Sequence, residues 1–463
     1  MSLIRNLTMK NFCLCCIATF FVGCGHDFLD IRRNANQVIP KTLADYDALL
    51  KSESIMNRTA FYLNMIGADD YSVEDKVLST IGVNHPWIRN AYDWQHTIFG
   101  PLEDSPDWNH SFNKIQAANL ALEARKLKGD KEQIDYVTGK ALFNRAWNYY
   151  HLATTFCTAY NPLTSNHSLG LPLVKELDVN AKVTRATLEE TYRFIESDLL
   201  EAKQLIGNKP APDKFTSSSV TVDALLAKLY FEMADYGESL AYGLAVLEQH
   251  PALLDYNDLD PKKRITFSNM PFGQGNPEVL MYFLGNTMVI LTSSRHDLRH
   301  TIWPLMEEGD LRKKVFFNVE RDNRVTFKGS YTGSLAFFTG VAVDEMYLLV
   351  AECYARSNEL MLAADYLNKL LVKRFESGLF TPLVFTSIAE ALKCIIKERR
   401  IQLLFRGTRW VDLKRYNKEE GLQTTLERTT FGETHRLLPN DSRYVWPIAP
   451  KEVNIGGLVA NER

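Results

Sequence analysis

The stretch LAKLYFEMADYGESLAYGLAVLEQHP, residues 226–251, decides the fold of this 463-residue chain. Ala227 and Ser239 put small side chains where the two helices of a hairpin would touch, with aromatic rings nearby at Tyr230 and Tyr236. Helices that pack about 8–10 Å apart leave no room for larger side chains at the contact. The pattern therefore predicts a tightly packed helix–turn–helix, which the proline at the end of the stretch terminates.

A second stretch repeats this pattern. In VAECYARSNELMLAADYLNKLL, residues 350–371, Ala351, Tyr354 and Ala363 stand at the matching positions, while Leu360 replaces the second aromatic residue. Both stretches align with the tetratricopeptide (TPR) unit, a helix–turn–helix of about 34 residues that stacks into solenoids.

Further helices are expected from looser amphipathic periods at residues 105–128, 130–159 and 187–206. The predicted fold class is therefore mainly α: a TPR-like helix-pair solenoid, with helix pairs at about residues 105–250 and 340–415.

Two long segments interrupt the helical pattern. Residues 253–339 combine prolines and glycines with few helical periods, and a short strand is expected at Glu278–Leu284. Residues 57–101 look similarly irregular. Long loop-rich segments mounted on a rigid scaffold often carry binding sites, so both segments are expected on a ligand-binding side.

The first 23 residues are expected to be a signal peptide. Arg5 and Lys10 precede the apolar run FCLCCIATFFV, which is shorter than the roughly 20 residues that a bilayer crossing needs. The run leads into FVGC, which resembles a bacterial lipobox cut before Cys24. We expect lipidation of Cys24, a stable membrane anchor because several acyl chains would attach, and a mature domain of residues 24–463.

Composition excludes several classes of protein. With 53 basic and 56 acidic residues the net charge is −3, which gives no electrostatic footprint for nucleic acid. The remaining cysteines of the mature chain are too few and too scattered for a disulfide framework or a CxxC metal site. We expect them to be buried as small apolar residues. They are Cys157, Cys353 and Cys394.

A search for catalytic motifs finds no nucleotide-binding loop and no hydrolase signature. His296 and His300 have a helical ligand spacing but lack the glutamate of a zinc hydrolase. Residues 255–260 depart from the EF-hand pattern. We therefore expect no metal, no cofactor and no enzymatic activity. A surface glycan hydrolase is the alternative, and two carboxylates about 5–10 Å apart in a cleft would mark it.

The most distinctive string is ERRIQLLFRGTRWVDLKR, residues 398–415. We interpret it as structural rather than as an anion site. Arg409 can pair with Asp412 on one helical face, and Glu398 can neutralise another guanidinium. Its apolar residues are expected in the core, namely Ile401, Leu404 and Trp410.

This string resembles the C-terminal signature of the SusD/RagB family of outer-membrane nutrient-binding lipoproteins of Bacteroidetes. YVWPIAPKEV (444–453) resembles the family's ending, DFLDI (27–31) its mature N-terminus, and GLPLV (170–174) falls in the family's order. The resemblance spans nearly the whole chain. Gln402 and Arg406 stand where acidic residues are more usual in the family.

The resemblance implies a function without catalysis. Family members are lipid-anchored at the cell surface, on the outer leaflet of the outer membrane, and form the lid of a TonB-dependent (SusC-like) transporter. They capture an oligosaccharide or, in some branches, a peptide. The helix pairs would face the transporter and the irregular segments the ligand. A TPR adaptor that binds a peptide is a further alternative, although the signal peptide argues against a cytosolic one.

Aromatic side chains are the expected ligand contacts, because sugars present apolar faces that stack on rings. The candidate ligand-binding residues of the irregular segments are Trp87, Trp303 and Tyr71. Both tryptophans stand beside a proline in polar surroundings, and we expect them exposed on one concave surface. Trp94 and Trp108 are expected in the core.

Overall fold

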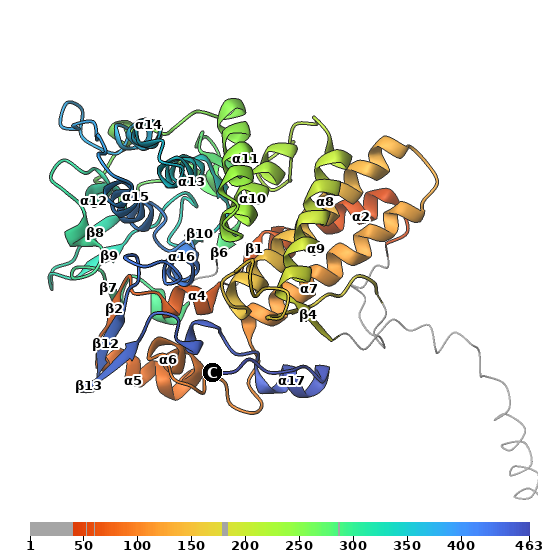
Figure 1. Cartoon of the computed structure of the whole chain (residues 1–463), viewed down its shortest axis with the longest axis horizontal. Helices are drawn as coiled ribbons and strands as arrows, with labels where there is room; N and C mark the ends of the chain where they lie inside the picture. Colours follow the sequence, from red (N-terminus) through yellow and green to blue (C-terminus); the bar gives the residue numbers. More distant parts are fainter. Residues whose placement is uncertain (1–39, 52, 60, 178–183, 286–287) are drawn as a thin grey trace, which may run out of the picture. The chain divides into compact units, whose positions relative to one another are not determined.

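A computed structural model describes residues 40–51, 53–59, 61–177, 184–285 and 288–463 of the chain (Figure 1). The predicted signal peptide and Cys24 lie outside the described residues. No helix in these ranges is both long and apolar enough to cross a membrane. Thr42–Arg463 pack as one unit.

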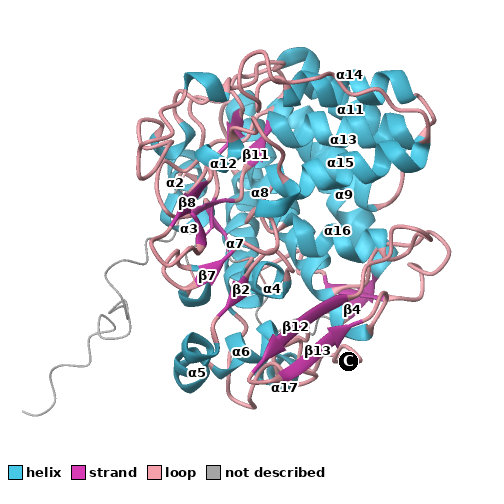
Figure 2. Ribbon diagram, turned by 90° about the vertical axis from the view of Figure 1, so that its left-hand side faces the viewer, coloured by secondary structure: helices cyan, strands magenta, loops and turns pink. Residues whose placement is uncertain are grey.

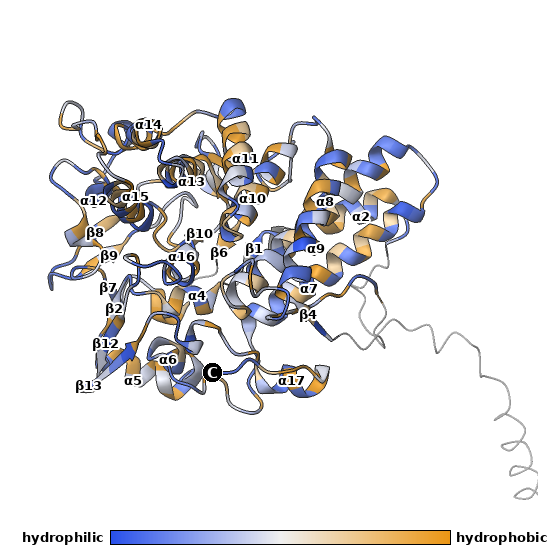
Figure 3. Cartoon of the chain, in the orientation of Figure 1, coloured by the Kyte–Doolittle hydropathy of each residue, from blue (hydrophilic) through white to orange (hydrophobic). Residues whose placement is uncertain are grey.

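The first helices pack around the long helix α8. They are α2 (Leu43–Leu50), α7 (Pro106–Leu122), α8 (Lys131–Phe156) and α9 (Leu188–Ile206). Helices α2, α7 and α9 all contact α8, and Figure 3 shows that α8 and α9 carry both hydrophilic and hydrophobic residues. Thr42 and Thr187 each close a capping box, which fixes where α2 and α9 begin.

Both predicted TPR-like pairs are confirmed. They are α10 (Ser219–Glu232) with α11 (Tyr236–Gln249), and α13 (Val343–Arg356) with α14 (Leu360–Leu371). The pairs stack through α11 and α13 (Figure 1). Ala227, Ser239 and Ala351 are fully buried, and the Ser239 hydroxyl donates to the Ala227 carbonyl at 2.9 Å. At Gly243 a Cβ would come within 2.8 Å of Val350 Cγ2, so the stacking needs a glycine there.

The distinctive C-terminal string forms α15 (Ile388–Gln402) and α16 (Thr408–Tyr416). Its predicted apolar residues are buried, and Trp410 stacks on Trp446 at 4.8 Å between ring centroids. The predicted pair of Arg409 with Asp412 is wrong. Because this part of the chain is buried, each side chain reaches another element instead: Arg409 binds Asp69, and Asp412 accepts a hydrogen bond from Arg399.

Residues 57–101 are not the loop-rich segment that the sequence predicted. The helices of this part of the chain have at most ten residues, too few to show repeated apolar periods. Trp94 and Trp108 are buried, as expected. The elements from residue 53 onward are α3 (Glu53–Met56), β1 (Arg58–Thr59), α4 (Tyr62–Gly67), β2 (Ser72–Val73), α5 (Asp75–Asn84) and α6 (Pro86–Tyr92).

Residues 253–339 are loop-rich with short strands, as predicted (Figure 2). β6 (Leu284–Gly285) is the middle strand of a three-stranded sheet, parallel to β1 and antiparallel to β10 (Phe337–Phe338). The other strands form antiparallel pairs. These are β2 with β7 (His296–Asp297), β5 (Val279–Met281) with β11 (Val341–Ala342), β8 (Phe317–Val319) with β9 (Val325–Phe327), β3 (Leu169–Pro172) with β4 (Arg185–Thr187), and β12 (Leu426–Thr430) with β13 (Glu433–Leu437). Two further short helices are α12 (Arg312–Val315) and α17 (Pro450–Gly456).

Candidate functional site

Strand pairing brings the two predicted ligand-side segments together. β1 pairs with β6, and in the β2–β7 pair Ser72 lies opposite Asp297. The hydroxyl of Thr301 also donates to the carbonyl of Asp70, 231 residues earlier. Segments that are far apart in the sequence therefore meet at these strands.

A hollow of about 260 Å³ lies beside β2 and β7, and we call it the β2–β7 groove. Apart from two valines, its lining residues are polar or charged, with three carboxylates and two guanidiniums among them. The lining consists of Ser72, Val73, Glu74, Val77, Ser294, Arg295, Asp297, Asp322 and Arg324.

Hydrogen bonds orient the charged side chains of the β2–β7 groove. The Arg324 guanidinium donates to the Asp322 carboxylate at 2.8 Å and to the Ser294 carbonyl at 3.2 Å. One carboxylate oxygen of Asp297 accepts from the backbone N–H groups of Val325 and Arg299, at 2.8 and 2.9 Å. Carboxylates and guanidiniums held in this way can accept from and donate to the hydroxyl groups of a ligand.

The C-terminal string anchors the base of this groove. Asp69 and Asp70 directly precede Tyr71 and strand β2. Arg409 donates to Asp69 at 2.8 Å, and Arg400 donates to Asp70 at 2.9 Å. The string is thus structural, as predicted, and it positions β2.

The pKa values of the two aspartates shift in opposite directions. Burial alone would raise the pKa of Asp69, but the guanidiniums of Arg409 and Arg400 hold it well below its ordinary value. The pKa of Asp70 is raised, because burial outweighs the attraction of Arg400. The ionised carboxylate of Asp69 therefore contributes more than that of Asp70 to the electrostatic attraction that anchors β2.

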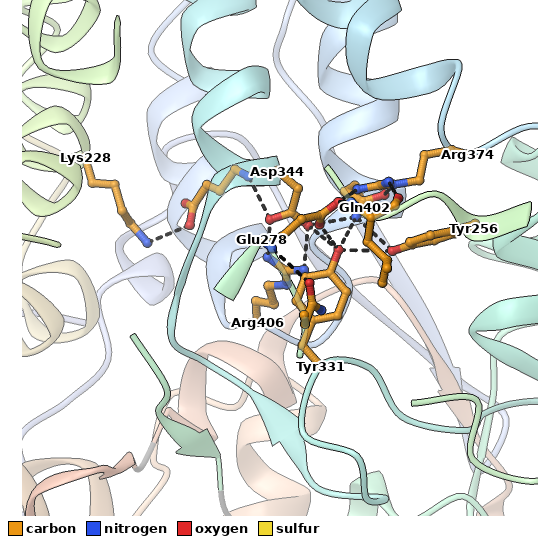
Figure 4. A network of polar contacts seen from close by, with 11 residues as sticks. Lys228, Tyr256, Glu278, Tyr331, Asp344, Arg374, Gln402 and Arg406 are labelled. Carbon is orange, nitrogen blue, oxygen red and sulfur yellow. Dashed lines mark hydrogen bonds and ion pairs between the residues drawn. The ribbon is translucent and has the colours of Figure 1, made fainter. Parts of the chain in front are cut away.

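A buried polar network joins the loop-rich segment to α13 and α15 (Figure 4). Arg406 binds Asp344 with two hydrogen bonds, at 2.9 and 2.7 Å. Arg374 donates to Glu278 at 2.7 Å. The Tyr331 hydroxyl lies between both carboxylates, 3.0 Å from Asp344. Gln402 and Tyr256 complete the network.

The carboxylates of this network cannot serve as a glycosidase pair. Glu278 and Asp344 are both fully buried, so no substrate could reach them in this structure. Each is also neutralised by its own arginine, a pairing that stabilises buried charges. The network therefore stabilises the fold and fixes the position of the loop-rich segment.

The two predicted tryptophans are neither fully buried nor fully exposed. Trp87, in α6, and Trp303, in a short 3₁₀ turn, each pack one side against the core. Trp87 contacts Phe99, with 5.8 Å between ring centroids, and Lys313 lies 5.5 Å from the Trp303 ring. Neither lines the β2–β7 groove. The expectation that both are exposed is met only in part, because each ring has a packing partner and is half-buried.

Tyr71 is not available as a ligand contact in this structure. Its side chain is 2% exposed, and its hydroxyl donates to the Ile66 carbonyl at 3.1 Å. Its ring packs against Tyr92 and Phe405. The residues that directly follow it, Ser72 and Val73, line the groove instead.

The described part of the chain holds no cluster of three or more histidine, cysteine or acidic side chains that could bind a metal. His296 lies in β7 rather than in a helix, and its ring contacts the Leu291 carbonyl and the Phe327 N–H. Cys157 and Cys353 are buried, and Cys394 is half-buried.

Sequence reasoning missed the charged residues of the groove, above all Asp322 and Arg324. They lie in a turn whose sequence, ERDNRV, is typical of any solvated loop. Their role depends on the pairing of β7 with β2 and on the contact of β7 with β9, which no local pattern encodes.

Comparisons with known proteins agree with this architecture. Residues 27–231 match a family model described as starch-binding and associating with the outer membrane, and residues 344–458 match the SusD family. SusD-like protein P2 of Formosa agariphila is 23% identical over 371 residues, which are 66% of this chain and 70% of that protein.

Solved structures share the fold. A SusD superfamily protein of Bacteroides thetaiotaomicron superposes with a TM-score of 0.73 at 17% identity, over 91% of this chain and 100% of that chain. A laminarin-binding SusD-like protein superposes with a TM-score of 0.64 at 18% identity, over 90% of this chain and 98% of that chain.

Proposed function

This chain belongs to the SusD family, and from that premise we propose that it is a cell-surface lipoprotein that binds an oligosaccharide. The observation that carries the proposal is the β2–β7 groove, a polar hollow on the side where the two predicted ligand-side segments meet. The starch-binding description of the matching family model and the laminarin-binding relative support a glycan as the ligand.

The chemistry of the groove favours a neutral ligand rich in hydroxyl groups. Three carboxylates and two guanidiniums nearly balance, so the groove offers little net attraction to a polyanion. Fixed acceptors and donors in alternation suit the vicinal hydroxyls of a sugar. We retain Trp87 and Trp303 as partial stacking platforms at the edges of the ligand, since both are only partly buried against the core.

Binding without hydrolysis is part of this proposal. A glycosidase needs one carboxylic acid whose pKa is raised so that it can protonate the leaving group. In the groove the hydrogen bond from Arg324 lowers the pKa of Asp322, which is the opposite direction. Purified protein should therefore release no reducing ends from a polysaccharide that it binds.

Isothermal titration against starch, laminarin and mixed peptides tests the proposal. Wild-type protein should bind one of the glycans, and Arg324→Ala should weaken that binding. Arg125→Ala is the matched control, because Arg125 forms an exposed pair with Glu201 and neither residue lines the groove. Trp87→Ala and Trp303→Ala should each cost about tenfold or more if the rings touch the sugar.

Three outcomes would contradict the proposal. Binding of peptides but of neither glycan would indicate a peptide-binding protein of the same family. Reducing ends that disappear in an Asp322→Asn variant would make the protein a hydrolase. Equal affinities of the Arg324→Ala variant and wild type would move the glycan away from the β2–β7 groove.

We also propose that the protein forms the lid of a TonB-dependent, SusC-like transporter in the outer membrane, anchored through a lipid on Cys24. The family membership and the lipobox-like sequence support this. Affinity purification of the tagged protein from detergent-solubilised outer membranes should recover a TonB-dependent barrel protein. Recovery of the protein alone would refute the lid role and leave glycan binding untouched.

A further inference from the structure

Phe272 holds an unfavourable backbone conformation without the burial that usually compensates for it. Its φ of 57° and ψ of 26° lie in the left-handed region, which is strained for a bulky side chain. Trp94 and Phe405 share this conformation, with φ of 50° and 56°, but both are buried. The side chain of Phe272 is 41% exposed.

Phe431 is the informative comparison. It is also exposed and has a φ of 51°. There the geometry of the chain explains the conformation, because Phe431 and Gly432 form the two-residue turn between β12 and β13, where positive φ is required. The Arg89 guanidinium also covers its ring at 4.3 Å. Phe272 lies in a loop that joins no hairpin, so strand pairing does not account for its conformation.

The Phe272 ring belongs to an aromatic cluster whose neighbours in the sequence line a hollow beside α10. Its centroid lies 5.8 Å from that of Phe215 and 5.7 Å from that of Tyr282. Lys214, the neighbour of Phe215, lines a hollow of about 470 Å³, and so does Leu280, two residues before Tyr282. This volume falls within the range of about 300–1,000 Å³ that is typical of ligand pockets.

The charged groups of this hollow are already engaged. Lys214 donates to the Val279 carbonyl at 2.5 Å, and Lys209 pairs with Glu132 at 2.9 Å. The Asp213 carboxylate accepts from the backbone N–H of Phe215 and from the Thr216 hydroxyl. The neutral polar side chains that remain can donate and accept hydrogen bonds. They include Asn208, Ser219 and Gln249.

We propose that the Phe272 ring and this hollow form a second glycan-binding site, in which a neutral pyranose stacks on the ring and places hydroxyl groups in the hollow. The inference rests on the proposed glycan-binding function. The site shares no lining residue with the β2–β7 groove. Two sites on one protein would hold a polysaccharide more tightly than either site alone, through the higher effective concentration at the second site.

Affinity electrophoresis of the mature protein in native gels that contain starch or laminarin tests this second site. Phe272→Gly removes the ring and the strain together. It should weaken retention by the bound polysaccharide about two- to tenfold, which corresponds to an aromatic contact of roughly 0.5–1.5 kcal/mol. Its melting temperature should equal or exceed that of wild type, whereas loss of a residue that serves packing would lower it. Phe272→Tyr should keep retention, and Phe431→Ala is the matched control.

Each result decides the question. Retention of Phe272→Gly equal to wild type in a gel where Arg324→Ala loses retention overturns the second site and leaves the proposed function standing. A lower melting temperature of Phe272→Gly, or an equal loss in Phe431→Ala, also overturns it. If wild type is retained by neither polysaccharide, the proposed function fails and the second site fails with it.

Discussion

Replacing Asp344 by asparagine tests how strongly the buried network stabilises the fold. The variant keeps the size of the side chain but leaves the Arg406 guanidinium without its counter-charge, and both residues are buried. Removing one partner of a buried ion pair costs about 3–5 kcal/mol, because the other charge stays desolvated. The unfolding entropy of a unit of roughly 420 residues is about 0.9 kcal/mol per kelvin, so the melting temperature should fall by about 3–6 °C.

Differential scanning calorimetry at pH 7 measures this change, and the chain offers a matched control. Asp322→Asn removes the same charge from an exposed side chain that pairs with Arg324, where water screens the charge and the melting temperature should change little. Combining Asp344→Asn with Arg406→Gln should recover part of the loss, because no unpaired buried charge then remains at this pair. A melting temperature of Asp344→Asn within 1 °C of the Asp322→Asn value would refute the reasoning.

Three further predictions concern the scaffold, a buried acid and the anchor. Ala227→Phe and Ala351→Phe should each overpack a helix contact and cost about 1–3 kcal/mol or more, and unchanged melting temperatures of both would contradict the packing described here. Burial raises the pKa of Asp107 to about 8, so wild type should lose stability as the pH rises from about 4 to 8. The side chain at position 107 does not titrate in Asp107→Asn, so the melting temperature of this variant should rise relative to that of wild type between pH 5 and pH 8.5. A difference in melting temperature that does not change with pH would show that Asp107 is ionised over this whole range. Cys24→Ala should release the protein from the membrane fraction, and a variant that stays bound after a salt wash would refute the lipid anchor.

The long helices could be predicted from the sequence, because the residues that determine them lie within one helix or one helical hairpin. The capping boxes at Thr42 and Thr187 and the small residues Ala227 and Ala351 each act within one helix or one hairpin. The short helices between residues 57 and 101 escaped prediction because none is long enough to establish an apolar period.

The partners of the charged residues could not be predicted, since they lie far away in the sequence. Arg409 had a plausible partner three residues later in Asp412, yet it binds Asp69, 340 residues earlier. The same limit applies to the groove, which exists only because β2 pairs with β7. Its aromatic side chain and its position in the segment 57–101 are all that indicate Tyr71 as a ligand contact, whereas its burial depends on Tyr92 and Phe405.

The anchoring of β2 by Arg400 and Arg409 has a consequence for the order of folding. The residues that hold the base of the groove are separated from it by 330 and 340 positions. Contacts of such sequence separation form late, after the local helices, because closing so long a loop carries a large entropic cost. As the chain emerges, the helical pairs can therefore assemble from the N-terminus onward, while the anchoring of the groove waits for the last seventh or so of the chain. A chain truncated before α15 lacks both arginines, so it would retain helical hairpins but lose both ion pairs that anchor the start of β2.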